Sequence, residues 1–204
     1  YPELQRNKLI EKINRDLVET IGLKPSQVKL TGMLVLYNNV LESLIRSQIL
    51  TIGVVFLAIT LMFLILFRSL KYSLIAIVPS IIASSSVLGL MGLLHIPLDI
   101  MTITIAAICI GIGVDHSIHY IHRFRKELQN NVKLDEAINN AHASTGQAIY
   151  FTSIIIIVGF SILGLSNFIP PIYFGVFTAF AMMIALIANL TLLPVLLMKM
   201  IRVN

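Results

Sequence analysis

The chain has 204 residues, of which 57% are hydrophobic and only 12% are charged, and its mean hydropathy is +0.90. A soluble domain carries roughly a quarter charged residues, so this composition excludes an ordinary soluble protein and indicates a membrane protein. The formal net charge is +5. Because the basic residues lie mainly between apolar runs, we interpret them as membrane topology signals and expect no nucleic-acid partner.

Residues 1–47 hold seven of the fifteen Lys and Arg residues and five of the ten acidic residues, which is typical of a segment outside the membrane. Apolar residues recur at helical spacing from Leu4 to Ile21, and Gly22 and Pro25 follow in the usual order for a helix end. The stretch "QVKLTGMLVLYNN" then predicts a strand and a turn, and "VLESLIRSQ" a connecting helix. We therefore expect residues 1–47 to form a small αβ piece of an extramembrane domain.

Five apolar runs follow, each close to the roughly 20 residues that a helix needs to cross a bilayer. The predicted spans are at about 49–67, 72–94, 100–122, 148–165 and 172–198. The predicted fold class is a mainly α membrane protein in which residues 48–204 form a transmembrane bundle. Because the chain begins with Tyr1 and the number of spans is odd, we expect a piece of a larger protein.

Basic residues also predict the orientation of these spans. Lys and Arg occur in the first and third loops and after the last span, whereas the turns at 95–99 and 166–171 contain neither. The positive-inside rule places the basic loops and the C-terminus in the cytoplasm, and residues 1–47 on the other side of the membrane.

The stretch "GIGVDHSIHYIHRFRKEL" (residues 111–128) places one acid and three histidines in the third apolar run. Asp115 lies fifteen residues past Ile100, which is about 22 Å along a helix and therefore inside the bilayer. Such an acid normally faces a bundle interior or a water-filled cavity. His119 and His122 share its helical face and His116 follows it directly. Since histidine titrates near neutral pH, the pattern favours proton transfer.

Hydroxyl and amide side chains elsewhere are candidate relay partners of Asp115: Thr152, Ser153 and Asn189. Gly111 and Gly113 leave room beside the acid for another helix or for water. Two alternatives to proton transfer remain open. The acid and its histidines could hold two helices together, or they could bind a metal. A metal site would normally draw ligands from several helices, so we expect neither a metal nor another cofactor.

A longer stretch carries a family resemblance. "MGLLHIPLDIMTITIAAICIGIGVDHSIHYIHRFRKEL" resembles the third span and signature of the resistance–nodulation–division (RND) superfamily, in its MMPL-like branch of hydrophobe exporters. "VKLTG", "FRSLKYSLIAIVPSII", "FTSIIIIVGFSILGLSNF" and "ALIANLTLLPVLL" resemble other parts of that fold. The resemblance implies one half of a twelve-helix pump, five spans preceded by the end of a periplasmic porter domain, and the short basic tail fits the C-terminal half.

The same resemblance implies a function. The acid matching Asp115 carries protons in this family, and proton flow drives export of lipids or other amphiphiles by a secondary transporter, not an enzyme, in a bacterial inner membrane. The family often has Tyr where this chain has His116. The implied partners are the other half of the transporter and a hydrophobic substrate, with a second copy or an accessory periplasmic protein as further candidates. Alternatives are a Patched-like sterol or lipid sensor, a SecDF-like export-assisting protein, and a membrane metalloenzyme.

Overall fold

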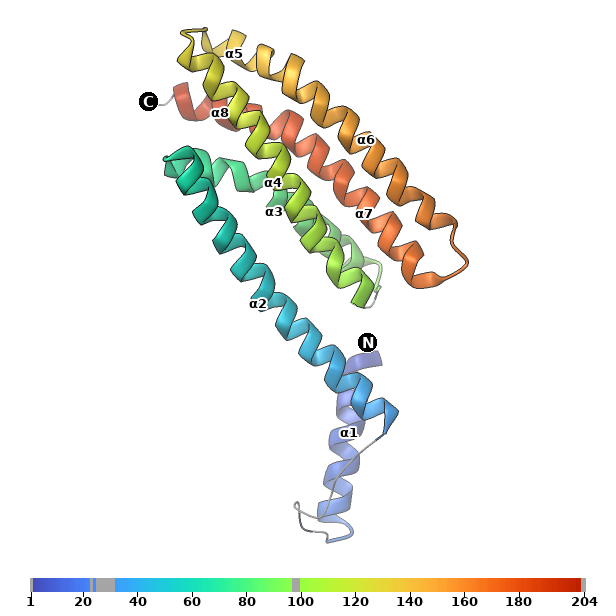
Figure 1. Cartoon of the computed structure of the whole chain (residues 1–204). Coiled ribbons are helices and arrows are strands. Elements are labelled where there is room, and N and C mark those ends of the chain that lie inside the picture. Colours follow the sequence, from blue (N-terminus) through green and yellow to red (C-terminus); the bar gives the residue numbers. More distant parts are fainter. Residues whose placement is uncertain (1, 23, 25–31, 97–99, 203–204) are drawn as a thin grey trace. The chain divides into compact units, whose positions relative to one another are not determined.

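The computed structural model describes residues 2–22, 24, 32–96 and 100–202. The chain divides into two compact units, residues 1–50 and 51–204. In the first unit, helix α1 covers Pro2–Glu19, and Gly22 after it has a φ of +76°, a left-handed conformation that glycine adopts without strain. Helix α2, Met33–Phe67, begins in the first unit and continues into the second (Figure 1).

The strand and turn predicted for residues 27–39 are wrong where the structure describes them. Residues 33–39 form the first two turns of α2, and residues 27–31 lie outside the described part of the chain. A short apolar run such as "MLVL" fits a strand and a buried helix equally well by its periodicity. The αβ character expected for residues 1–47 is therefore not supported, and its described residues are mainly helical.

The second unit is an α-helical bundle whose elements follow one another with short connections (Figure 1). After α2 come α3 (Leu70–Leu93), α4 (Ile100–Gln129), α5 (Leu134–Ala141), the π-helical turn η2 (His142–Gly146), α6 (Gln147–Ser161), the 3₁₀ turn η3 (Ile162–Leu165), α7 (Ile169–Ile187), the π-helical turn η4 (Ala188–Leu192) and α8 (Leu193–Arg202).

Five of these segments are long and apolar enough to cross a membrane, which confirms the five predicted spans. They are Leu50–Phe67, Leu70–Leu93, Thr104–Gln129, Leu134–Leu165 and Ile169–Ile201. Large apolar side chains such as Leu57, Ile65 and Ile155 are exposed on the surface of the bundle. In a helix that lies in a bilayer, lipid replaces water against such side chains, so their exposure fits the composition of the chain.

Helices α3, α4 and α7 pack against one another in the centre of the bundle, and α6 lies beside α7 (Figure 1). Helices α4 and α6 make few direct contacts and meet mainly through the turn η2. Both helices pack against α7 instead, and a groove remains between them.

Arg125 of α4 binds to the connection between α2 and α3. Its Nη1 donates a hydrogen bond to the backbone oxygen of Phe67, at 2.9 Å, and its guanidinium lies 5.1 Å from the centre of the Tyr72 ring. The carbonyls in the last turn of a helix lack partners within the helix, so this bond satisfies one of them at the end of α2. The helix that contains Asp115 is thereby tied to the end of α2.

Candidate functional site

Helix α4 has one tightly packed face and one open face. On the packed face, a Cβ atom added to Gly113 would lie 2.7 Å from the Oγ of Ser80, so the glycine allows α3 to approach closely. On the open face, no heavy atom of the described residues lies within 4 Å of the position that a Cβ of Gly111 would take. Asp115 and His119 follow Gly111 at four-residue intervals, so they share its open face.

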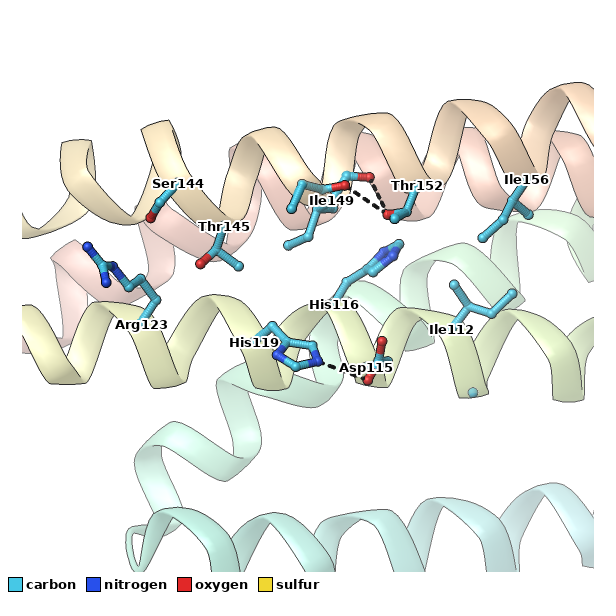
Figure 2. A pocket seen from close by; sticks show the side chains of 12 residues that line it. Ile112, Asp115, His116, His119, Arg123, Ser144, Thr145, Ile149, Thr152 and Ile156 are labelled. Carbon is cyan, nitrogen blue, oxygen red and sulfur yellow. Dashed lines mark hydrogen bonds and ion pairs between the residues drawn. The ribbon is translucent and has the colours of Figure 1, made fainter.

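Asp115 and His119 lie next to each other, as their spacing predicts. The Nε2 of His119 is 3.4 Å from Oδ1 of Asp115, and both side chains are 65% exposed. The acid lies near the middle of the span Thr104–Gln129 but faces outward and not into this bundle. Within the described residues, the ionisable side chain next to it is His119, one turn along the same helix (Figure 2).

The open face of α4 forms one wall of a groove of about 750 Å³, and α6 with the turn η2 forms the other (Figure 2). The residues that line it are Gly111, Ile112, Asp115, His116, His119, Arg123, Ser144, Thr145, Ala148, Ile149, Thr152 and Ile156. Its volume is in the range of small-molecule sites. Polar groups from two helices therefore meet at the level of the predicted relay.

His116 extends from α4 toward α6 and lies beside Thr152 (Figure 2). Only 6% of the residue is exposed, and its Nδ1 has no hydrogen-bond partner among the described residues. Because a buried polar atom without a partner costs about 1–3 kcal/mol, this nitrogen favours the entry of a ligand, a water or a second polar group into the groove.

Two of the predicted partners lie on α6, at different places. Thr152 lines the groove, and its hydroxyl donates to the backbone oxygen of Ala148 at 3.0 Å, so that its oxygen can still accept a hydrogen bond. Ser153 is buried, does not line the groove and has an Oγ without a partner among the described residues. The structure therefore brings Thr152, but not Ser153, to the acid's groove.

Asn189 is not brought to Asp115. Its Oδ1 accepts a hydrogen bond of 2.9 Å from the hydroxyl of Ser117, and its Nδ2 donates to the backbone oxygen of Ala185 at 2.9 Å. Ser117 lies two residues after Asp115, about 200° around the helix, and so points away from the groove. Asn189 therefore stabilises the packing of α4 against η4, and the expectation that it is a partner of Asp115 is not supported by this geometry.

We predict a measurable coupling between Ser117 and Asn189. In a double-mutant cycle of Ser117→Ala and Asn189→Ala, the two changes should be non-additive by about 0.5–1.7 kcal/mol, the size found for interhelical hydrogen bonds in membranes. The measurement is the free energy of unfolding in detergent. Strict additivity would show that the bond contributes nothing to the bundle.

The groove lacks one residue that was predicted to belong to the relay and contains three that were not predicted. His122 shares the helical face of Asp115 but is exposed beyond the groove and does not line it. Arg123, Ser144 and Thr145 do line it, and the sequence analysis did not select them. Arg123 could have been found, because it continues the four-residue spacing from Asp115. Nothing in the sequence indicated the π-helical turn that contains the two hydroxyls, although such turns are often found at functional sites.

A metal centre finds no support in this geometry. Among the residues that the structure describes, no group of three or more His, Cys, Asp or Glu side chains could hold a metal ion.

A bundle of five helices that are long and apolar enough to cross a membrane, one of which bears an acid–imidazole pair beside a groove, defines a multi-pass membrane protein. A family comparison makes this class specific. Residues 3–203 match the model of the MMPL family, and the chain therefore belongs to the MMPL family, in agreement with the resemblance of its signature stretch.

Three relatives illustrate the match. The chain is 31% identical over 189 residues to the membrane protein MJ1562 of Methanocaldococcus jannaschii, a match that covers 93% of this chain and 49% of the relative. It is 28% identical over 206 residues to the hopanoid transporter HpnN of Burkholderia multivorans, and this match covers 97% of this chain and 23% of the relative. It is 23% identical over 162 residues to the trehalose monomycolate exporter MmpL3 of Mycolicibacterium smegmatis, and this match covers 76% of this chain and 14% of the relative.

The chain thus spans about half the length of the first of these relatives and less of the others. No solved structure gives a significant match.

Proposed function

We propose that the chain forms part of a proton-driven RND/MMPL-type exporter of lipids or other amphiphiles, a secondary transporter and not an enzyme. The observation that carries the proposal is the Asp115–His119 pair, 3.4 Å apart, on the open face of a membrane-spanning helix. An ionisable side chain at such depth is costly and is found mainly where it has a function. The relatives named as transporters of a hopanoid and of trehalose monomycolate support a lipid-like cargo.

In this proposal Asp115 takes up and releases the proton, and His119 exchanges it over one helical turn. His116 and Thr152 line the same groove and extend the relay toward α6. His122 would take the proton beyond the groove, toward the end of α4, and Ser153 would act only after a movement that brings its buried hydroxyl to the groove.

The exposure of Asp115 supports a partner that covers it. A carboxylate that is 65% exposed in the middle of a span would face hydrocarbon if this bundle stood alone in a bilayer. Charged groups within membranes normally face a bundle interior or a water-filled cavity. We propose that the other half of the transporter packs against this face of α4. A second copy or an accessory periplasmic protein would bind elsewhere.

The basic loops support an orientation in the bacterial inner membrane. Arg68 lies between the first two spans, Lys71 lies at the beginning of the second, and Lys133 lies between the third and the fourth. By the positive-inside rule these loops and the C-terminus are cytoplasmic, and residues 1–47 are periplasmic.

Proton-coupled movement tests the proposal directly. The full-length protein would be reconstituted into vesicles made from the total lipid of its source cells and loaded with a pH-sensitive dye. An imposed proton gradient should drive lipid to an external acceptor, and lipid movement should be accompanied by proton flux. A protonophore that collapses the gradient should stop the lipid movement.

A Patched-like lipid sensor or a SecDF-like export-assisting protein would give a different result. A sensor would bind lipid without coupled proton flux. An export-assisting protein would show proton flux but no lipid transfer, and its loss would slow preprotein release. Lipid transfer that continues unchanged without a proton gradient would contradict the proposed mechanism.

A further inference from the structure

The side chain of Arg125, near the end of α4, contacts both α2 and α3. Its guanidinium lies over two aromatic rings, 5.8 Å from the centre of the Phe67 ring and 5.1 Å from the centre of the Tyr72 ring. Phe67 is the last residue of α2, and Tyr72 lies in the first turn of α3. The hydrogen bond from Nη1 to the backbone oxygen of Phe67 adds to these cation–π contacts. One side chain of α4 therefore holds the end of one helix and the start of the next.

Helix α2 is packed most firmly at the same place. Within the span Leu50–Phe67, the buried residues are Phe63 and Phe67, both in its last two turns. They belong to the same core cluster as Ile121 and Phe124 of α4. The guanidinium thus binds α2 where this helix is already in contact with the core of the bundle.

Only two residues connect α2 to α3. Arg68 has a φ of +50°, a left-handed conformation that residues other than glycine rarely adopt, and Ser69 is extended, with a φ of −153°. The backbone nitrogen of Arg68 donates to the backbone oxygen of Leu64 at 2.9 Å, so the connection stays joined to the last turn of α2. Such a short connection has little slack, and a displacement of it moves the end of α2.

Both helices that meet at Arg125 are uninterrupted. Helix α4, Ile100–Gln129, carries Asp115 and Arg125 ten residues apart, which is about 15 Å along its axis. Helix α2 continues for 35 residues, from the first unit to the contact with Arg125 (Figure 1). Neither helix contains a proline, whereas α3 contains Pro79. Because continuous helices are stiff, they can carry a displacement over such lengths.

We propose that Arg125 is a positioning residue that couples α4 to α2. When Asp115 gains or loses a proton, the displacement of α4 passes through Arg125 to the end of α2 and along this helix to the first unit. The inference rests on the proposed proton-driven export and deepens it, because it identifies the contact through which the relay acts on the rest of the chain. Arg125 itself exchanges no proton, since a guanidinium stays charged in proteins.

Loss of this contact should uncouple the two activities. In vesicles with the reconstituted full-length protein, Arg125→Gln should retain proton flux but lower lipid transfer about tenfold or more, the factor that corresponds to one charge-assisted hydrogen bond. Asp115 and the residues that line its groove are unchanged in this variant, so the acid can still exchange its proton. The measured quantity is the number of lipid molecules transferred per proton.

Further variants separate the contact from a general effect on the fold. Tyr72→Leu removes one ring and should lower the lipid transferred per proton by a smaller factor, and it replaces the first test if Arg125→Gln fails to fold. Arg125→Lys should restore part of the coupling, because an ammonium keeps the charge but lacks the planar fork. Two matched controls should behave as the unchanged protein does: Tyr72→Phe keeps the ring, and Lys126→Gln removes a charge from an exposed position of α4.

The transmitted movement can also be measured without transport. Spin labels on cysteines introduced at Ile65 and Ile155, which are exposed on α2 and α6, report the distance between these helices. The buried Cys109 would be replaced by alanine. Asp115→Asn, which resembles the protonated acid, should change this distance. Adding Arg125→Gln should abolish the change.

Three outcomes would overturn the proposal. Equal loss of proton flux and lipid transfer in Arg125→Gln would mean that the contact only supports the fold. Unchanged lipid transfer per proton would mean that the coupling passes through other contacts. A helix distance that does not respond to Asp115→Asn, or responds equally without Arg125, would exclude transmission through this side chain. If the unchanged protein shows no proton-coupled transfer while the helix distance depends on Arg125, the proposed export fails and the coupling contact stands.

Discussion

Replacing Asp115 with asparagine is expected to reduce proton-coupled lipid transfer to background while the protein still folds and inserts. Asparagine has nearly the same shape but cannot take up and release a proton at neutral pH. The side chain is 65% exposed, and the ionisable group next to it is His119. Asparagine keeps an oxygen that can accept a hydrogen bond from His119, so the free energy of unfolding should change by no more than about 1 kcal/mol. Transfer and unfolding would be measured on the same preparation.

A matched control tests whether the loss of any other acidic side chain has the same effect on lipid transfer. Glu136→Gln removes a carboxylate from an exposed position of α5, outside the groove, and should leave lipid transfer unchanged. His119→Gln should lower the rate without abolishing it, because the acid remains and His116 still lines the groove. Transfer by Asp115→Asn at the rate of the unchanged protein would refute a role for this carboxyl as the proton carrier.

The five spans could be predicted from the sequence because they depend on local properties. Length and hydropathy of each run determine whether a helix can cross a bilayer, and neither requires knowledge of the packing. The closeness of Asp115 and His119 is local for the same reason, since residues four apart on one helix are neighbours. The segment at 33–39 shows the limit of such reasoning, because a few apolar residues have no distinctive period.

The opposite wall of the groove could not be predicted, because it depends on how α6 and η2 rotate against α4. Thr152 and Ser153 are adjacent in the sequence, yet only Thr152 reaches the groove. Asn189 has a depth suited to a relay partner, but depth does not determine the face of a helix. It lies opposite Ser117, on the far side of α4 from the acid.

Gly175→Ala is expected to destabilise the bundle more than any other single methyl addition at a described glycine. A Cβ atom at Gly175 in α7 would lie 2.5 Å from the Cβ of Leu163 and 2.5 Å from the backbone oxygen of Phe160. These atoms cannot rotate away, because one belongs to a backbone and the other is attached to it directly. The segment that contains α6 and η3 must therefore move away from α7, and overpacking of this kind costs about 1–3 kcal/mol or more. The measurement is the free energy of unfolding in detergent.

Two other glycines make this prediction specific. Gly159 lies on α6, and no heavy atom of the described chain is within 4 Å of a Cβ added there, so Gly159→Ala should be neutral or stabilise the helix by up to about 1 kcal/mol. Gly113→Ala should fall between the two, because the atom in its way is the Ser80 hydroxyl, which can rotate. From the most to the least stable variant, the expected order is Gly159→Ala, Gly113→Ala and Gly175→Ala. If Gly175→Ala were as stable as Gly159→Ala, the close approach of α6 and α7 would be incorrect, and with it the position of the wall that α6 forms opposite Asp115.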